Sequence, residues 1–282
     1  DDDMRALLGQ PILVFPAPDA PSYEEGLVLC RRFIERWQEH PLITPAVAPH
    51  AWYTATPELL RACADLARAF DVPLHTHVSE TALEAANCRE DNHTPVVGWI
   101  SRQGLLNTKL LAAHCVHLDK EEMFMLKEAG AGVAHCPTSN LKLASGIARV
   151  GDMLEIGMKV GVGTDGPASN NDLDMFEEVR LAALLAKTAS DDPTVLPARQ
   201  ALEVATIGGA RALHMADVTG SLEPGKRADL AVVSTTGVHN QPHFHTNPDT
   251  IYSRLIYAAK AGDVVHVMCN GRWLLRDREL QT

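Results

Sequence analysis

Apolar runs of at most nine residues alternate with amphipathic helical stretches up to residue 165, and this alternation restricts the possible folds most strongly. Runs of this length are typical of strands that are buried on both faces of a sheet. They are Leu7–Phe15, Leu42–Ala48, Val72–Val78, Leu110–Val116, Gly132–Cys136 and Val160–Thr164. Strands that alternate with helices predict a parallel sheet with right-handed crossovers. Both an open doubly wound sheet and a (β/α)₈ barrel fit this pattern.

Helix start and stop signals lie between the runs. Tyr23–Gln38 has apolar residues spaced by three and four, and Thr56 followed by Pro57 predicts the start of a second helix. Asp119 is a candidate N-cap for a helix that Gly130 ends. After residue 165 the sequence predicts two helices, a strand, a helix and a hairpin, in the ranges Asp172–Lys187, Pro197–His214, Leu230–Val233, Asp249–Lys260 and Val264–Arg276. The hairpin is predicted from the Asn-Gly pair at 270–271.

Polar residues at the strand ends favour the barrel. His50, His77, His114, His135 and Asp165 each lie at or just after the C-terminal end of a predicted strand. In a barrel these ends meet at one mouth, where active sites are built. In an open sheet the same residues would be spread along an edge. The predicted fold class is therefore α/β, with a TIM-type (β/α)₈ barrel.

Composition excludes several classes of protein. The 282 residues are 46% hydrophobic, which is enough for a large core, and one barrel domain can accommodate this length. The net charge of −11 argues against a nucleic-acid partner. No apolar run approaches the ~18 residues of a transmembrane helix, so no membrane partner is expected. The six cysteines are scattered without a C-x-x-C pair, which predicts reduced thiols and a cytoplasmic protein.

The most specific motif is His75-Thr76-His77-Val78-Ser79-Glu80. On a strand, His75 and His77 point to the same side, and Glu80 follows the strand end. Histidine ligands with a nearby carboxylate suit a zinc-activated water, whose pKa falls to ~7 and whose proton the carboxylate transfers. The alternative is two core histidines and a solvated glutamate.

Three further motifs follow later predicted strands. They are Ala112–His117 with His114, Ala134–Leu143 with His135, and Val162–Gly166 with Asp165. Each motif alone also fits a structural interpretation: a core histidine, a hydrogen-bonded loop and a tight turn. In this order and on successive strands, the four motifs together are much more specific than any one of them.

Together they resemble the amidohydrolase superfamily and, within it, the 5-methylthioadenosine/S-adenosylhomocysteine deaminases. The resemblance rests on His77-x-x-Glu80, the segments Ala113–Leu118, Ser139–Gly146 and Gly163–Asn171, and the return segment Gly220–Asp229. It covers essentially the whole chain. It implies metal-dependent hydrolytic deamination of an adenosine derivative to an inosine-type product and ammonia.

The resemblance also implies roles for five residues. His77 is expected to ligate the metal, and Asp165 to ligate it and accept a proton from the attacking water. Glu80 is expected to contact the substrate and act as general acid and base. His114 would orient the water, and His50 would contact the substrate. One divalent metal per site is implied, most simply zinc, with iron, manganese or nickel as alternatives.

Two other histidines receive weaker roles. His75 is expected to support the metal site without ligating the metal, and His135 to lie beside the site. Four acidic residues open the predicted helix Asp172–Lys187, and we expect them to face solvent and the helix dipole. They are Asp172, Asp174, Glu177 and Glu178. Arg31 and Arg32 lie nearest to an arginine expected from the family, but a helix-surface role is predicted for both.

The resemblance assigns the six runs to strands three to eight of the barrel. Residues 1–220 are then a barrel lacking strands one and two, and residues 221–282 the C-terminal portion of a small composite β-sandwich domain. The family's first His-x-His pair is expected in a segment before residue 1. Alternatives are a guanine, 8-oxoguanine or cytosine deaminase, a triazine hydrolase, or a catalytically inactive binding paralogue. The family also implies a homo-oligomer.

Overall fold

A six-stranded parallel sheet organises the larger part of the molecule. The computed structural model describes residues 3–243 and 247–281. The strands follow one another in sequence order: β1 (Ala6–Ile12), β2 (Ile43–Pro49), β3 (Pro73–Val78), β4 (Lys109–His114), β5 (Gly132–His135) and β6 (Lys159–Val162). All six predicted strands are confirmed. Every crossover between these strands steps in the same direction, whereas a doubly wound sheet reverses its order at a switch point.

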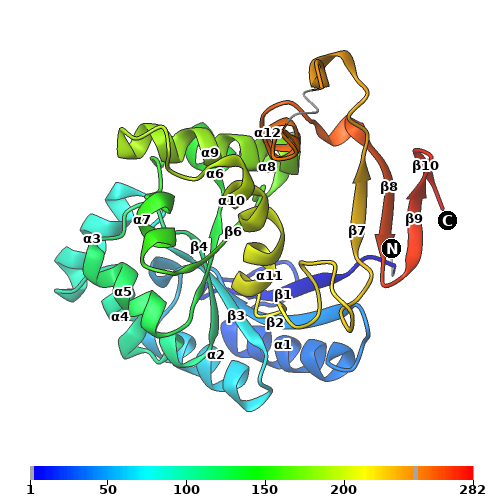
Figure 1. The fold of residues 1–282 in the computed structure, drawn as a ribbon. Helices are drawn as coiled ribbons and strands as arrows, with labels where there is room; N and C mark the ends of the chain where they lie inside the picture. Colours follow the sequence, from blue (N-terminus) through cyan, green and yellow to red (C-terminus); the bar gives the residue numbers. More distant parts are fainter. Residues whose placement is uncertain (1–2, 244–246, 282) are drawn as a thin grey trace.

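Helices line the outer face of this sheet (Figure 1). The first part of the chain supplies α1 (Tyr23–Trp37), α2 (Pro57–Ala69), α3 (Ala82–Asn92), α4 (Val96–Arg102), α5 (Lys120–Glu128), α6 (Pro137–Lys142) and α7 (Val150–Glu155), with short turns η1 (Trp52–Thr54) and η2 (Leu105–Asn107). The predicted caps are present, since Thr56 accepts from the Leu59 amide and Asp119 from the Glu122 amide. Between sheet and helices lies a core of side chains at most 1% exposed, including Ile34, Leu59, Leu60, Leu74, Leu110 and Leu126.

A second group of helices follows β6. It comprises α8 (Pro167–Asn170), α9 (Met175–Ser190), α10 (Ala198–Glu203), the π-helical turn η3 (Val204–Gly208) and α11 (Gly209–Ala212). The predicted helix Pro197–His214 is thus a helix with a π-turn in its middle. Helix α11 packs directly on the sheet because β5 has a glycine there: a Cβ on Gly132 would overlap the carbonyl group of Ala212.

The last part of the chain forms a four-stranded antiparallel sheet. Its order is β10 (Glu279–Leu280), β9 (Arg272–Arg276), β8 (Val264–Cys269) and β7 (Leu230–Val233), and the connecting segments include η4 (Val238–Asn240), α12 (Thr250–Tyr257) and η5 (Ala261–Asp263). The Asn-Gly hairpin is confirmed, since Asn270 and Gly271 have φ values of 50° and 82°. Arg5, just before β1, pairs with Asp229, just before β7, at 2.5 Å and links the two sheets.

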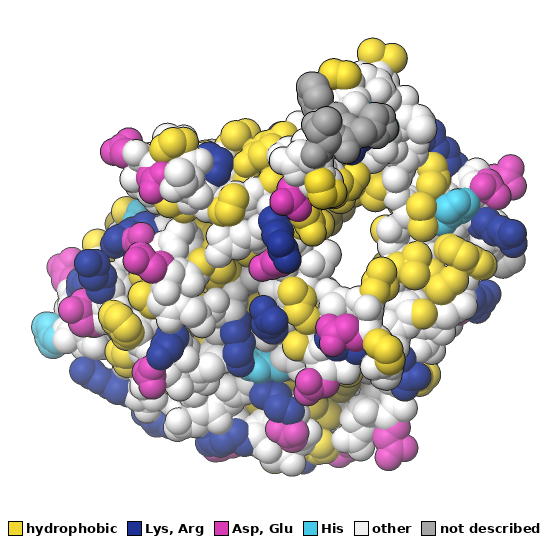
Figure 2. Space-filling view, in the orientation of Figure 1, with side chains coloured by type: hydrophobic (Ala, Val, Ile, Leu, Met, Phe, Trp, Pro, Cys, Tyr) yellow, Lys and Arg dark blue, Asp and Glu magenta, His cyan; other side chains and the backbone are white. Residues whose placement is uncertain are grey.

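The two sheets differ in how much side-chain surface they bury. Figure 2 shows an opening between the four-stranded sheet and the rest of the molecule, with hydrophobic side chains on the sheet side. Val232 on β7 remains 39% exposed, and Leu280 on β10 76%. All six cysteines are buried free thiols, as predicted. None of the helices in the described part of the chain has the length and apolar character needed to cross a membrane.

Candidate active site

The predicted site residues lie at the C-terminal ends of neighbouring parallel strands. His50 follows β2, His77 lies in β3 with Glu80 just after it, and His114 ends β4. Asp165 follows β6. Since β2, β3 and β4 are hydrogen-bonded neighbours in the sheet, their C-terminal ends are adjacent in space.

His50, His77 and His114 form a row of imidazole rings, called here the histidine row. The ring centroids of His50 and His77 lie 4.7 Å apart, and those of His77 and His114 lie 5.3 Å apart with nearly parallel planes. The row is partly to fully buried, and His114 is only 1% exposed. Burial, followed by the neighbouring His77, lowers the pKa of His50. Burial therefore favours the neutral imidazole of His50, the form of a histidine that accepts protons.

The backbone of His50 fixes the tautomer of His77. Its carbonyl oxygen lies 2.7 Å from Nδ1 of His77, and a carbonyl oxygen can only accept. The same carbonyl accepts from the Thr76 hydroxyl and the His77 amide, so three donors hold the end of β2 against β3. With Nδ1 protonated, neutral His77 presents the lone pair of Nε2, which is the arrangement that orients a metal-binding histidine.

Glu80 faces the end of the histidine row. Its Oε2 lies 3.7 Å from Nε2 of His114, too far for a direct hydrogen bond but within the distance of an ion pair. From the described residues, the other carboxylate oxygen of Glu80 accepts one long hydrogen bond, 3.4 Å, from the hydroxyl of Ser145. On its far side, Nδ1 of His114 bonds the side-chain oxygen of Asn140 at 2.8 Å. Nε2 of His114 is thereby directed toward Glu80.

Asp165 occupies a strained turn and is held by three donors. Its φ of 60° lies in the left-handed region, where non-glycine residues are uncommon. The carboxylate accepts from the hydroxyls of Ser139 and Ser169 at 2.7 and 2.9 Å, and from the amide of Gly166 at 2.7 Å. Burial alone would raise the pKa of the Asp165 carboxyl, but these hydrogen bonds outweigh burial and lower it.

His75 and His135 are buried near the same residues. Burial lowers the pKa of His75 to about 4, with smaller contributions from His77 and His114. Burial likewise lowers the pKa of His135 to about 4, with a smaller contribution from His114. His135 is 2% exposed, and its buried Nδ1 has no hydrogen-bond partner in the described structure. Both side chains lie within the electrostatic range of His114.

Comparison with known proteins identifies the family. The model of the amidohydrolase family matches residues 2–274. The chain belongs to the amidohydrolase family. A 5-methylthioadenosine/S-adenosylhomocysteine deaminase of Syntrophobacter fumaroxidans is 45% identical over 279 residues, which are 99% of this chain and 63% of the relative. One of Moorella thermoacetica is 47% identical over 85% of this chain and 55% of the relative.

Solved structures agree with this assignment. An adenosine deaminase from Xanthomonas campestris with bound zinc superposes with a TM-score of 0.94 at 41% identity, covering 98% of this chain and 62% of that one. An atrazine chlorohydrolase from Arthrobacter aurescens complexed with zinc has a TM-score of 0.87 at 26% identity, with the same coverage of both chains. This amidohydrolase chain thus spans about three fifths of the length of these relatives.

The donor set of this amidohydrolase fits part of a metal site. Imidazole nitrogen and carboxylate oxygen are suitable zinc ligands, and His77 presents a free Nε2. However, within residues 3–243 and 247–281 no three His, Cys, Asp or Glu side chains converge closely enough to hold a metal ion. The described residues therefore supply suitable donors without a complete ligand set.

One sequence prediction about the acidic residues is wrong. Glu178 was expected to face solvent at the start of α9, but it is 1% exposed. Its carboxylate accepts from the Thr138 amide at 3.1 Å and from the Asn170 side chain at 2.6 Å. Thr138 and Asn170 are sequence neighbours of Ser139 and Ser169, the two residues whose hydroxyls bond the Asp165 carboxylate. Asp174, by contrast, caps α9, since it accepts from the Phe176 and Glu177 amides.

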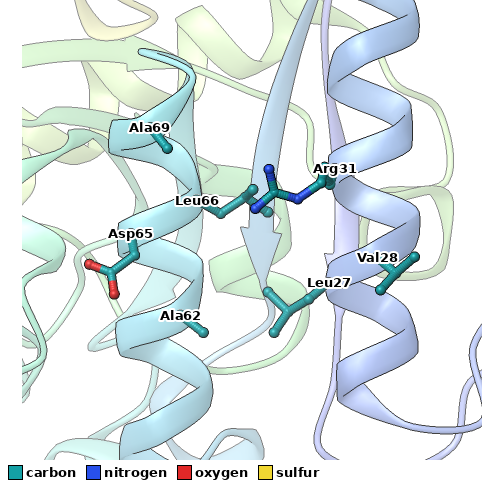
Figure 3. Close-up of a pocket in the computed structure, with 7 residues that line it drawn as sticks. All are labelled: Leu27, Val28, Arg31, Ala62, Asp65, Leu66 and Ala69. Atoms are coloured by element: carbon teal, nitrogen blue, oxygen red, sulfur yellow. The ribbon is translucent and has the colours of Figure 1, made fainter.

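The helix-surface role predicted for Arg31 agrees with the structure. Its guanidinium lies 5.3 Å from the ring centre of Phe70, in cation–π contact. Figure 3 shows Arg31 and Leu27 of α1 facing Leu66 of α2 across a cavity of 430 Å³. This cavity lies between two outer helices, and none of the predicted site residues lines it. It is therefore separate from the candidate active site.

Several residues that hold the site were not assigned roles from the sequence. Asn140, Ser139 and Ser145 belong to the segment Ser139–Gly146, which carried the family resemblance but no individual functions. Glu84 was missed altogether, although Thr81-x-x-Glu84 has the spacing of a helix capping box. That spacing was the available signal.

Proposed function

We propose that this amidohydrolase deaminates 5-methylthioadenosine, S-adenosylhomocysteine or a close adenosine derivative, giving the inosine-type product and ammonia. The observation that supports this most directly is the approach of Glu80 to His114 at 3.7 Å beside His77. A deaminase needs such a carboxylate, because protons must move from the attacking water to the purine ring and the leaving amine. The relatives named as deaminases of these two compounds support the substrate class.

Glu80 acts as the general acid and base in this proposal. Its carboxylate accepts a proton from the attacking water and delivers it to the purine ring nitrogen next to C6. Water oxygen adds to C6, the bond from C6 to the amino nitrogen breaks, and ammonia leaves. Nε2 of His114 orients the water, and Asp165 accepts the second proton of the water and passes it to the leaving amino group. His50 contacts the nucleoside.

We propose one divalent metal ion per site, with His77 and Asp165 among its ligands. When bound, such an ion lowers the pKa of a water molecule to ~7 and so supplies the nucleophile at neutral pH. The zinc in two structural relatives favours zinc over iron, manganese or nickel. The fixed tautomer of His77 and the anionic Asp165 support their role as ligands.

We further propose that β1 to β6 correspond to strands three to eight of a (β/α)₈ barrel. Residues 1–220 would belong to this barrel and residues 221–282 to a small composite β-sandwich domain. The sequential strand order and the high structural similarity to an amidohydrolase support this assignment. The resemblance to the deaminases also supports a homo-oligomer, and the six free thiols support a cytoplasmic location.

A substrate panel tests the proposed function. Ammonia release by the purified, zinc-supplemented protein is measured with 5-methylthioadenosine, S-adenosylhomocysteine, adenosine, guanine, 8-oxoguanine and cytosine, and chloride release with a chlorotriazine. We expect the first two compounds to give the highest kcat/KM. Preference for another base, or for the triazine, would replace the proposal with that activity. No turnover of any compound, together with no zinc uptake, would identify a binding paralogue.

A further inference from the structure

Glu84 makes contacts that its place in a helix does not require. It lies in the first turn of α3 and is only 6% exposed. Its Oε2 accepts from the backbone amide of Glu80 at 2.6 Å, and its Oε1 from the amide of Ser79 at 3.1 Å. Both carboxylate oxygens are thus directed at the two residues that follow His77 and Val78 at the end of β3.

The bonded segment has an unfavourable backbone conformation. Ser79 has a φ of 50°, in the left-handed region that costs a non-glycine residue about 1 kcal/mol or more. This turn redirects the chain after β3, so it determines the direction in which the Glu80 side chain points. Two hydrogen bonds to a charged acceptor at consecutive amides stabilise that conformation.

Burial of the Glu84 carboxylate is costly. Desolvation raises the pKa of Glu84, and the amide hydrogen bonds from Glu80 and Ser79 offset only part of this rise. A glutamate that merely completes a capping box bonds the amide of its N-cap residue and can remain exposed. Glu84 interacts with the backbone amide of the N-cap Thr81, but it also reaches past Thr81 to the two residues before it. The arrangement therefore favours a role in the site over helix capping alone.

We propose that Glu84 is a positioning residue, which holds the backbone of Glu80 so that the Glu80 carboxylate faces His114. This inference rests on the proposed function of Glu80. The long contacts of the Glu80 carboxylate support this role, because the two contacts that it makes with described residues, Ser145 and His114, measure 3.4 and 3.7 Å. The direction of Glu80 thus depends mainly on its backbone, and the backbone amide is bonded to Glu84.

Glu122 provides a matched control. It is 1% exposed and lies in the first turn of α5, and its carboxylate accepts from the amides of Asp119 and Val97, both at 3.1 Å. Burial raises its pKa, as it does for Glu84. Neither bonded amide belongs to a predicted site residue. Glu122→Gln therefore measures the cost of neutralising a buried, amide-bound carboxylate, including the loss of its 3.4 Å ion pair with Arg89.

The test compares Glu84→Gln with Glu122→Gln in deamination of 5-methylthioadenosine and in urea unfolding. Glutamine preserves side-chain length but offers only one acceptor oxygen, so one of the two amides loses its partner. We expect similar stability losses in the two variants. Only Glu84→Gln should lower kcat, by about 10- to 100-fold, as expected for a misplaced catalytic group, with KM changed less than about threefold.

Hydrogen exchange of the backbone gives a readout that does not depend on turnover. The peptide containing Ser79 and Glu80 should exchange faster in Glu84→Gln than in the wild type, and at the wild-type rate in Glu122→Gln. Unchanged exchange in Glu84→Gln would overturn the proposal, as would equal losses of kcat in both variants. If the wild type deaminates nothing, the proposed function fails, and hydrogen exchange alone decides whether Glu84 holds this segment.

Discussion

Glu80 and Asp165 both follow strands of the parallel sheet, but their carboxylates are held differently. Asp165 accepts three hydrogen bonds of 2.7 to 2.9 Å, from two serine hydroxyls and one amide. The Glu80 carboxylate has one contact of 3.4 Å and one of 3.7 Å. For Glu80 the strong hydrogen bond is made by the backbone amide, which bonds Glu84 at 2.6 Å.

This difference matches the two proposed roles, a metal ligand for Asp165 and a general acid and base for Glu80. A metal ligand should stay anionic and keep one orientation, and hydrogen bonds to its oxygens favour both. A group that carries protons must change protonation state and reach two positions during one turnover, which strong hydrogen bonds to its oxygens would oppose. We infer that the site fixes the backbone of Glu80 but leaves its carboxylate free to move, and that it fixes the carboxylate of Asp165 itself.

The largest expected effect is a loss of activity, and the zinc content of the variants should distinguish the role of Glu80 from that of Asp165. Glu80→Gln should lower kcat for 5-methylthioadenosine by about 1,000-fold, the scale of a lost general acid and base, while zinc content stays at the wild-type level. Asp165→Asn should lower both activity and zinc content, because a ligand is weakened. Metal analysis of the purified variants, alongside ammonia release, provides the measurement. Loss of zinc in Glu80→Gln, or wild-type activity in it, would contradict the division of roles.

The pH dependence of the free energy of unfolding tests the effect of burying His135. This residue ends β5, which lies between β4, where His114 is the last residue, and β6, which Asp165 follows. Burial lowers the pKa of His135 from its ordinary 6.5 to about 4, so between these values the unfolded state binds more protons than the folded state. The contribution of neutral His135 to the free energy of unfolding is therefore fully present above pH ~6.5. It is lost as the pH drops toward ~4, by about 3 kcal/mol in total.

The variant His135→Gln removes this titration. Between pH 7 and pH 4, its free energy of unfolding should fall by about 3 kcal/mol less than that of the wild type, as measured by urea unfolding at each pH. Equal losses in the two proteins would show that His135 does not account for the acid sensitivity of the site.

The architecture was largely predictable because it depends on local patterns. Apolar runs located all six strands of the parallel sheet to within about three residues, and cap residues such as Thr56 and Asp119 located helix starts. The π-turn at Val204–Gly208 was not predicted, because the apolar periodicity continues through it. The sandwich interpretation of residues 221–282 is untested, since the described strands form a single four-stranded sheet.

The site was predictable only where a motif brings its residues together. Strand ends supplied His50, His77, Glu80, His114 and Asp165, which the fold places at the C-terminal ends of the parallel strands. The residues that hold them were missed because their partners are distant in sequence: Asn140 bonds His114 across 26 residues, and Glu178 bonds Thr138 across 40. Glu178 was misread because acidic residues at a helix start are usually solvated.

The smallest expected effects come from the serines that contact each carboxylate. Ser139→Ala removes a 2.7 Å hydrogen bond from Asp165 and should lower the free energy of unfolding by about 1 kcal/mol, with a loss of kcat/KM of about tenfold. Ser145→Ala removes only the 3.4 Å contact with Glu80 and should change kcat by less than about threefold. Steady-state kinetics and urea unfolding of both variants provide the comparison. A larger kinetic loss in Ser145→Ala than in Ser139→Ala would mean that the Glu80 carboxylate, not only its backbone, must be held for catalysis.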